Sequence, residues 1–220
     1  MKRTLIGATS AFCLLLAGGA FAAPADQPGH ESPGAGTSSE PMSAVEDATA
    51  GAVGMVSAEM TSTTKGFVDA AATGDMYEVE AGRIAEHRAQ SAAVRDFAQH
   101  MVEAHTQTTD QLKSILAENN IQIAPPAHLD DRRQGMIDNL RGAKAADFDH
   151  RYLAQQEAAH REAEILMGGY AKDGDNQAVK RFASEILPIV QDHLAMVKKL
   201  IEERDNAANV ASPSDKIRKN

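Results

Sequence analysis

The hydrophobic and polar positions of this chain repeat with the period of an α-helix from about residue 64 to residue 204. Apolar side chains recur three and four positions apart, so they fall on one side of each predicted helix. The pattern is cleanest between Ser91 and Glu118. Its apolar members there are Val94, Phe97, Ala98, Met101, Leu112, Ile115 and Leu116. Aromatic residues make up only 4% of the chain and Trp is absent, which favours a core of small side chains between close-packed helices.

Five helical segments are predicted, and Asn, Gly and Pro residues separate them. They run over about Gly66–Ala89, Ser91–Glu118, Leu129–Leu140, Ala145–Lys172 and Asn176–Arg204. Asn119 and Asn120 end the second segment, and Pro125 with Pro126 prevents the helix from restarting at once. Pro188 lies inside the last segment, where we expect a kink or a bulge.

The four long segments form two pairs, and each pair is joined by a short connection. The connection between the pairs has about 25 residues and carries the short segment. This order predicts an all-α fold, a ferritin-like four-helix bundle with one long crossover that contains a short helix. We expect the helical domain at residues 64–204 and a disordered tail at residues 205–220. Residues 24–63 are predicted to be a flexible linker rich in Pro, Gly and Ser, in which Val45–Met60 has the composition of a weak helix.

Residues 1–23 are predicted to be a secretory signal peptide. Two basic residues precede an apolar stretch from Leu5 to Ala17, and an Ala-x-Ala-like cleavage site follows at about Ala22. The apolar stretch is short for a permanent membrane span, so no integral membrane segment is expected after cleavage. The protein is therefore expected in the periplasm or the cell envelope.

Loss of the signal peptide would remove the one cysteine, Cys13, and two of the 22 basic residues. The mature protein would then have no disulfide, no thiolate ligand and no cysteine nucleophile. The formal charge is −9 for the whole chain and becomes more negative after cleavage, which argues against nucleic acid as a partner. Any metal ion would have to be held by His, carboxylate or backbone groups. The sequence indicates no particular protein partner.

Each of the four long predicted helices turns one polar side chain toward the expected core. On helical wheels these residues fall on or at the edge of the apolar side, whereas most other charged residues point away. The four residues are Glu78, His105, His160 and His193. An unpaired buried polar group costs about 1–3 kcal/mol, so the four residues need partners or a ligand.

Two interpretations of these four residues are open. In the first, they bind one divalent transition metal (Zn, Fe, Mn, Cu or Ni), because imidazole and carboxylate suit such ions and bundle interiors hold such sites. In the second, they form a buried polar network in which Glu78 pairs with protonated histidines, and the protein is a structural or interaction module. A metal with an open position would also allow an oxidoreductase. No motif singles out a catalytic or cofactor-binding residue.

A dinuclear iron centre is not expected, because such centres need a Glu-x-x-His motif on each of two helices. Only Glu157 and His160 have that spacing, and Glu157 points away from the core. No Glu stands three residues before His105 or His193. His193 also lies farther from the start of its helix than the other site residues, which predicts a mismatch in height unless Pro188 absorbs it.

Several stretches of the chain share residues and spacing with a bacterial protein family. They are Phe67-Val-x-x-Ala-Ala, Asp75-Met-Tyr-Glu78-Val-Glu-Ala-Gly, Val94-x-x-Phe97-Ala-x-x-Met101-Val-x-x-His105, Phe148-Asp-x-x-Tyr152, His160, and Phe182-Ala with His193-Leu. In these stretches, which span about Thr64 to Leu200, the chain resembles the domain of unknown function 4142 proteins. The resemblance implies a ferritin-like helical domain exported to the periplasm or outer envelope. With the inward residues, it leads us to expect metal binding or protection from envelope stress.

Overall fold

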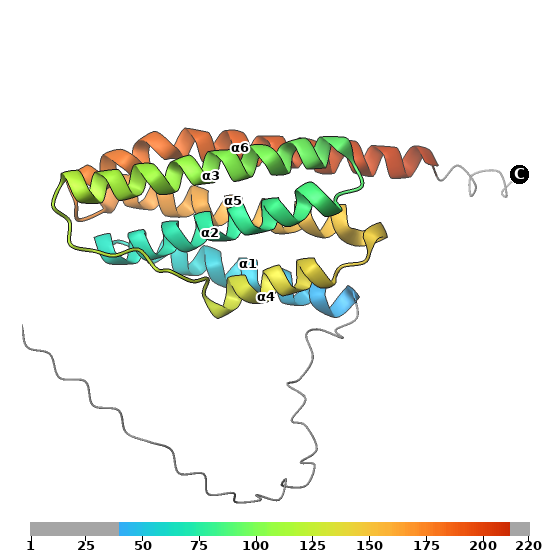
Figure 1. Ribbon diagram of the computed structural model, residues 1–220, viewed down its shortest axis with the longest axis horizontal. Coiled ribbons are helices and arrows are strands. Elements are labelled where there is room, and N and C mark those ends of the chain that lie inside the picture. Colours follow the sequence, from blue (N-terminus) through green and yellow to red (C-terminus); the bar gives the residue numbers. More distant parts are fainter. Residues whose placement is uncertain (1–39, 212–220) are drawn as a thin grey trace, which may run out of the picture. The chain divides into compact units, whose positions relative to one another are not determined.

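The computed structural model describes residues 40–211 (Figure 1). Within this range the chain forms six α-helices and no strand. The helices are α1 (Glu40–Glu59), α2 (Thr64–Arg88), α3 (Ala92–Glu118), α4 (Asp131–Gly142), α5 (Ala145–Asp173) and α6 (Gln177–Ala211). The prediction of an all-α helical bundle is confirmed. The predicted signal peptide with Cys13, the first part of the predicted linker and residues 212–220 lie outside the described residues.

Five helices begin and end within about two residues of their predicted bounds, apart from the end of α6. Side-chain caps explain several of these starts. The side chain of Thr63 accepts a hydrogen bond from the amide of Gly66 at 3.2 Å, at the start of α2. Asp130 accepts one from the amide of Arg133 at 2.8 Å, at the start of α4. Asn176 accepts from the first amides of α6.

The last helix is longer than predicted. α6 passes through Pro188 and continues to Ala211, whereas the sequence analysis ended it at Arg204 and expected disorder from residue 205. Residues 205–211 contain no Gly or Pro, so nothing in them stops a helix that is already formed. The final turns of α6 extend past the other helices (Figure 1).

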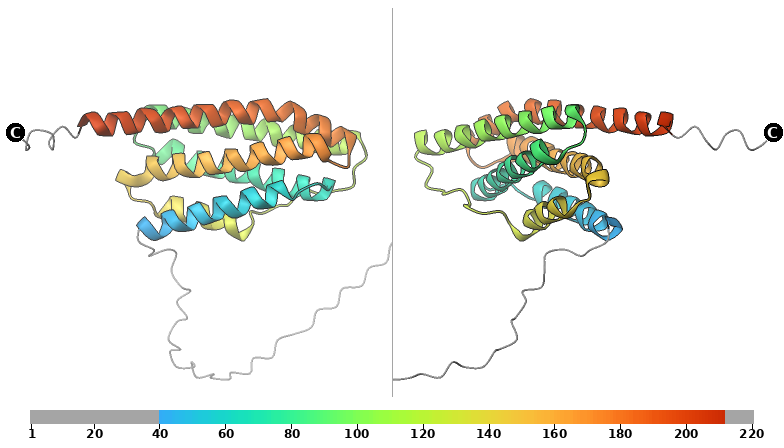
Figure 2. Two further views of the ribbon diagram at one scale, coloured as in Figure 1. Left: turned by 180° about the vertical axis from the view of Figure 1, so that it is seen from behind. Right: turned by 45° about the vertical axis from the view of Figure 1, so that its right-hand side comes forward.

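The helices are arranged in three layers of two (Figures 1 and 2). α2 and α5 form the middle layer, with α3 and α6 on one side and α1 and α4 on the other. Short connections pair α2 with α3 and α5 with α6, while the long connection from α3 to α5 carries α4. The four long helices therefore form the expected bundle, and α1 and α4 add a layer to it.

α1 occupies the second half of the segment predicted as a linker, and it packs mainly against α5 and also against α4. Small residues explain the close contact, since a Cβ added at Gly51 would lie 3.0 Å from the Cβ of Ala158. The buried carboxylate of Asp47 also accepts a hydrogen bond from Arg151 at 2.9 Å. The weak helix predicted for Val45–Met60 is therefore present as α1, and the small residues of this segment allow its close packing.

The outward face of α1 carries large apolar side chains that remain exposed. They are Met42, Val45, Val53 and Val56, and the exposed Met60 follows directly after the helix. None of the helices within residues 40–211 has the length and hydropathy needed to cross a membrane.

Two apolar clusters fill the bundle, one toward each end, and a polar layer lies between them. Phe97, Phe148 and Tyr152 belong to the first cluster, which surrounds the start of α3 and α5. Phe67 and Phe182 belong to the second, which surrounds the start of α2 and α6. The inward polar residues predicted from the sequence lie between these clusters along each helix.

The backbones of α2 and α3 approach closely beside this polar layer. A Cβ added at Gly82 would lie 2.7 Å from Val102 Cγ2 and 3.0 Å from the carbonyl oxygen of Ala98. A side chain at this position would therefore push α3, which carries His105, away from α2.

Candidate metal centre

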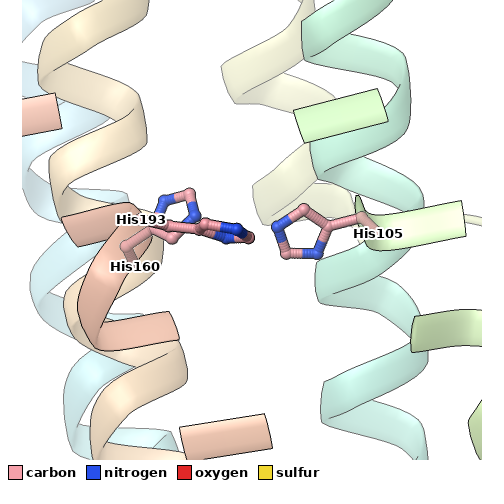
Figure 3. A group of neighbouring side chains, drawn as sticks. All are labelled: His105, His160 and His193. Atoms are coloured by element: carbon pink, nitrogen blue, oxygen red, sulfur yellow. The ribbon is translucent and has the colours of Figure 1, made fainter. Parts of the chain in front are cut away.

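The structure brings three of the four predicted site residues together. His105 from α3, His160 from α5 and His193 from α6 point toward one another between the helices (Figure 3). Their exposed fractions are 7%, 1% and 4%. The ring centroids lie 5.6 Å apart for His105 and His160, 5.7 Å for His105 and His193, and 5.4 Å for His160 and His193. One ring nitrogen from each residue lies within 4.8 Å of the others.

The mismatch in height expected for His193 is not present, because its ring meets the other two. That mismatch was expected from the number of residues between each helix start and its site residue, which would fix the height only if all helices began at the same height along the bundle axis. α6 instead begins farther from the site than its neighbours, and it reaches His193 as a continuous helix through Pro188.

Three ring nitrogens of this cluster are buried and have no hydrogen-bond partner within residues 40–211. They are His105 Nε2, His160 Nε2 and His193 Nδ1. The opposite nitrogens of His105 and His160 are bonded: His105 Nδ1 lies 2.8 Å from Asp75 Oδ1, and His160 Nδ1 lies 2.9 Å from the carbonyl oxygen of Gln156. Since these acceptors need a donor, each neutral ring carries its proton on Nδ1. The Nε2 lone pairs are then available to the cluster.

Asp75 is a site residue that the sequence analysis did not single out. It is 5% exposed, and its second oxygen accepts a hydrogen bond from Thr109 at 3.2 Å. A carboxylate behind a histidine is the usual way in which metal sites orient the ring and make it more basic. A signal was present in the sequence, because Asp75 stands three residues before Glu78 and so shares its side of α2. Asp75 is thus a second inward polar residue on α2, beside Glu78.

Glu78 is buried, at 3% exposed, and lies beside the three histidines. One of its oxygens accepts a hydrogen bond from Gln156 Nε2 at 2.6 Å. The other oxygen lies 3.8 Å from His160 Nδ1. Glu78 therefore lies on the Nδ1 side of the His160 ring, away from the unbonded Nε2, and burial raises the pKa of its carboxyl group.

Burial keeps two of the three histidines neutral. Burial, followed by the neighbouring His105 ring, lowers the pKa of His160 to about 3. Burial and the neighbouring rings also lower the pKa of His193 to about 3. His105 differs, because the hydrogen bond and charge of Asp75, with the charge of Glu78, outweigh burial and raise its pKa above the ordinary value. Burial therefore favours free lone pairs on His160 and His193, whereas the raised pKa of His105 reflects its bond to Asp75.

The space between the rings fits a small ion. A cavity of about 40 Å³ adjoins the three histidines, enough for an ion with one or two waters. Bonds of 2.0–2.1 Å to a tetrahedral ion would place the ligand nitrogens about 3.3 Å apart. The ligand nitrogens now lie within 4.8 Å of one another, so the three rings would move closer together on binding the ion. One position would remain for water or another ligand.

The Glu-x-x-His spacing contributes no ligand from Glu157. Its carboxylate pairs with Arg161 at 2.6 Å on the outer face of α5, as the sequence analysis expected. Within residues 40–211 the group of three histidines is the one place where at least three His, Cys, Asp or Glu ligands converge.

The family model described as "Domain of unknown function (DUF4142)" matches residues 50–200, which is more than half of the chain. The protein belongs to the DUF4142 family. The matched DUF4142 region begins within α1, ends within α6 and contains all three histidines together with Asp75 and Glu78. No curated protein and no solved structure matches the chain.

Proposed function

We propose that this protein binds one divalent transition-metal ion through His105, His160 and His193 in the core of its helical bundle. The observation that carries the proposal is the convergence of three buried ring nitrogens that lack hydrogen-bond partners within the described residues. Each buried group left without a partner costs about 1–3 kcal/mol. One shared ion would satisfy all three at once.

The donors favour a particular class of ion. Three imidazole nitrogens suit Zn²⁺, Cu²⁺ and Ni²⁺, whereas Mg²⁺ and Ca²⁺ prefer oxygen ligands. Fe²⁺ and Mn²⁺ fit less well, because sites for these ions commonly include a carboxylate ligand. The carboxylates of Asp75 and Glu78 lie next to the rings and would offset the charge of a buried divalent ion.

We place this function in the periplasm or cell envelope because of the predicted signal peptide. A ligand set made of imidazoles suits an oxidising compartment, since it contains no thiol that could form a disulfide. The proposed role is metal handling or protection from envelope stress, and it requires no catalytic residue.

A second candidate is a structural or interaction module in which the same residues only hold the core together. The bond between Asp75 and His105 supports it, as does the raised pKa of His105. A proton on His105 would place a donor among the other two rings without any metal.

Elemental analysis of the untagged mature protein separates the two candidates. His160→Ala is compared with His150→Ala, because His150 is exposed and lies on the same helix. The metal proposal expects about one ion for each wild-type and His150→Ala chain and none for His160→Ala. It also expects the melting temperature to rise with that ion. A wild-type protein that is metal-free, and that Zn²⁺, Cu²⁺, Ni²⁺, Fe²⁺ and Mn²⁺ all fail to stabilise, would leave only the structural candidate.

A further inference from the structure

A fourth histidine lies at the surface directly beside the buried three. His100 on α3 is exposed, and its ring centroid lies 5.1 Å from that of His193, with the two rings nearly perpendicular at 84°. The His193 ring in turn lies 5.4 Å from that of His160 and 5.7 Å from that of His105. His193 therefore stands between a surface imidazole and the core cluster.

The two nitrogens of His193 have different surroundings. Nδ1 is buried without a hydrogen-bond partner, as expected for an atom of the cluster. Nε2 of His193 is not among the buried nitrogens that lack a partner, and no side chain of the described residues forms a hydrogen bond with it. One ring thus offers a nitrogen to the core and a second one toward less enclosed surroundings.

Around the rest of the site lie apolar packing, ion pairs and two cavities, one bordered by Ile189 and one that reaches Asp75. The two apolar clusters lie above and below the polar layer, and a hydrated ion would lose its waters there without replacement. Toward α4, Arg133 pairs with Glu162 at 2.6 Å and donates to Thr73 at 3.1 Å. Ile189, which is 43% exposed, borders the cavity on the side of α6 and offers no ligand atom. His100 is the exposed imidazole whose ring lies next to a ring of the buried cluster.

We propose that His100 is the access ligand of the metal centre, an inference that rests on the proposed metal function. A divalent transition-metal ion binds first to His100 and His193 where α3 meets α6. It then passes to the buried nitrogens of His105 and His160, while His193 stays bound to it. Imidazole nitrogens replace the waters of the ion one by one, so the ion is never without ligands on the way in.

The test follows Zn²⁺ uptake by the full mature protein in stopped-flow competition with a chromogenic chelator. His100→Ala is compared with wild type and with His87→Ala, which removes an exposed histidine from α2. We expect His100→Ala to slow both association and dissociation by a common factor on the order of tenfold. The stoichiometry and the dissociation constant should stay at the wild-type values, and His87→Ala should match wild type in every respect.

The outcomes separate this inference from the proposed function. If the wild type takes up no Zn²⁺, Cu²⁺ or Ni²⁺, both proposals are wrong. If the wild type binds Zn²⁺ and His100→Ala has unchanged rates, only the access role is wrong, and the ion enters elsewhere, such as beside Ile189. A weaker equilibrium affinity in His100→Ala with an unchanged association rate would make His100 a ligand of the final site, which also overturns the access role.

Discussion

Replacing Asp75 by Asn is the sharpest probe of how the polar layer is held together. The change keeps the shape of the side chain and removes its charge. Asp75 lies 2.8 Å from His105 Nδ1 and is almost fully buried, so the pair is little screened by solvent. An Asn oxygen can still accept the bond from the neutral ring. The variant therefore removes the charge-assisted part of the contact and spares the packing.

The expected loss of stability depends on pH. The pKa of His105 is raised in the folded protein, so its stabilising contribution is fully present below the ordinary value of about 6.5 and is lost as pH rises through the folded value. Asp75→Asn removes the main cause of that rise. A hydrogen bond to a charged group contributes about 1.5–3 kcal/mol, so we expect the variant to lose about 2–3 kcal/mol at pH 5.5. The loss should be about 1 kcal/mol at a pH well above the folded pKa of His105.

The assay is urea unfolding followed by far-UV circular dichroism, with EDTA present, at pH 5.5 and pH 9. His160 and His193 gain protons on unfolding at pH 5.5 in wild type and variant alike, so their effect cancels in the comparison. Asp69→Asn is the control, because Asp69 lies on the same helix at the surface and should change stability by less than about 0.5 kcal/mol. Equal losses for Asp75→Asn at both pH values would refute the assignment of the raised pKa of His105 to its bond with Asp75.

Two further results are expected from the same layer. The metal-free protein should lose stability as pH falls from about 6.5 toward 3, because in this range His160 and His193 bind protons only in the unfolded chain. The free energy of unfolding should fall by at most about 2.7 kcal/mol per pH unit. A constant urea midpoint between pH 7 and pH 5 would contradict this expectation. Gly82→Ala should cost about 1–3 kcal/mol in thermal or urea unfolding and weaken metal binding, since the added Cβ meets α3. Gly135→Ala, in open space on α4, should be neutral or stabilising by up to about 1 kcal/mol, and equal effects of the two glycine changes would show that close packing is not the cause.

The helices and the three histidines could be predicted because each depends on local sequence. Apolar residues at helical spacing mark the inner face, and a histidine among them must also face inward. The position of Asp75 on the inward side of α2 could be read from its spacing to Glu78, but its pairing with His105, 30 residues away on another helix, could not. The hydrogen bond of Glu78 to Gln156, 78 residues away, could likewise not be predicted from helical periodicity.

α1 was predicted only as a weak helix within a flexible linker, for a related reason. Its buried carboxylate, Asp47, pairs with Arg151, 104 residues further along the chain, and with Asn139, 92 residues away. Taken alone, the α1 segment has few large apolar residues on the face that it buries. Its helix is stabilised mainly by packing on α5, which a window of local sequence does not contain.

The same long separation has a consequence for the order of assembly. A chain made from its N-terminus produces α1 first, yet the surface that receives α1 is complete only after α5 has formed. The hairpins of α2 with α3 and of α5 with α6 close short loops and can fold early, whereas docking of α1 closes a loop of about a hundred residues. α1 should therefore dock last and detach first, and its amide protons should exchange faster than those of α2 and α5. Detachment of α1 would therefore expose the surface of α5 that it covers, while the other helices remain folded.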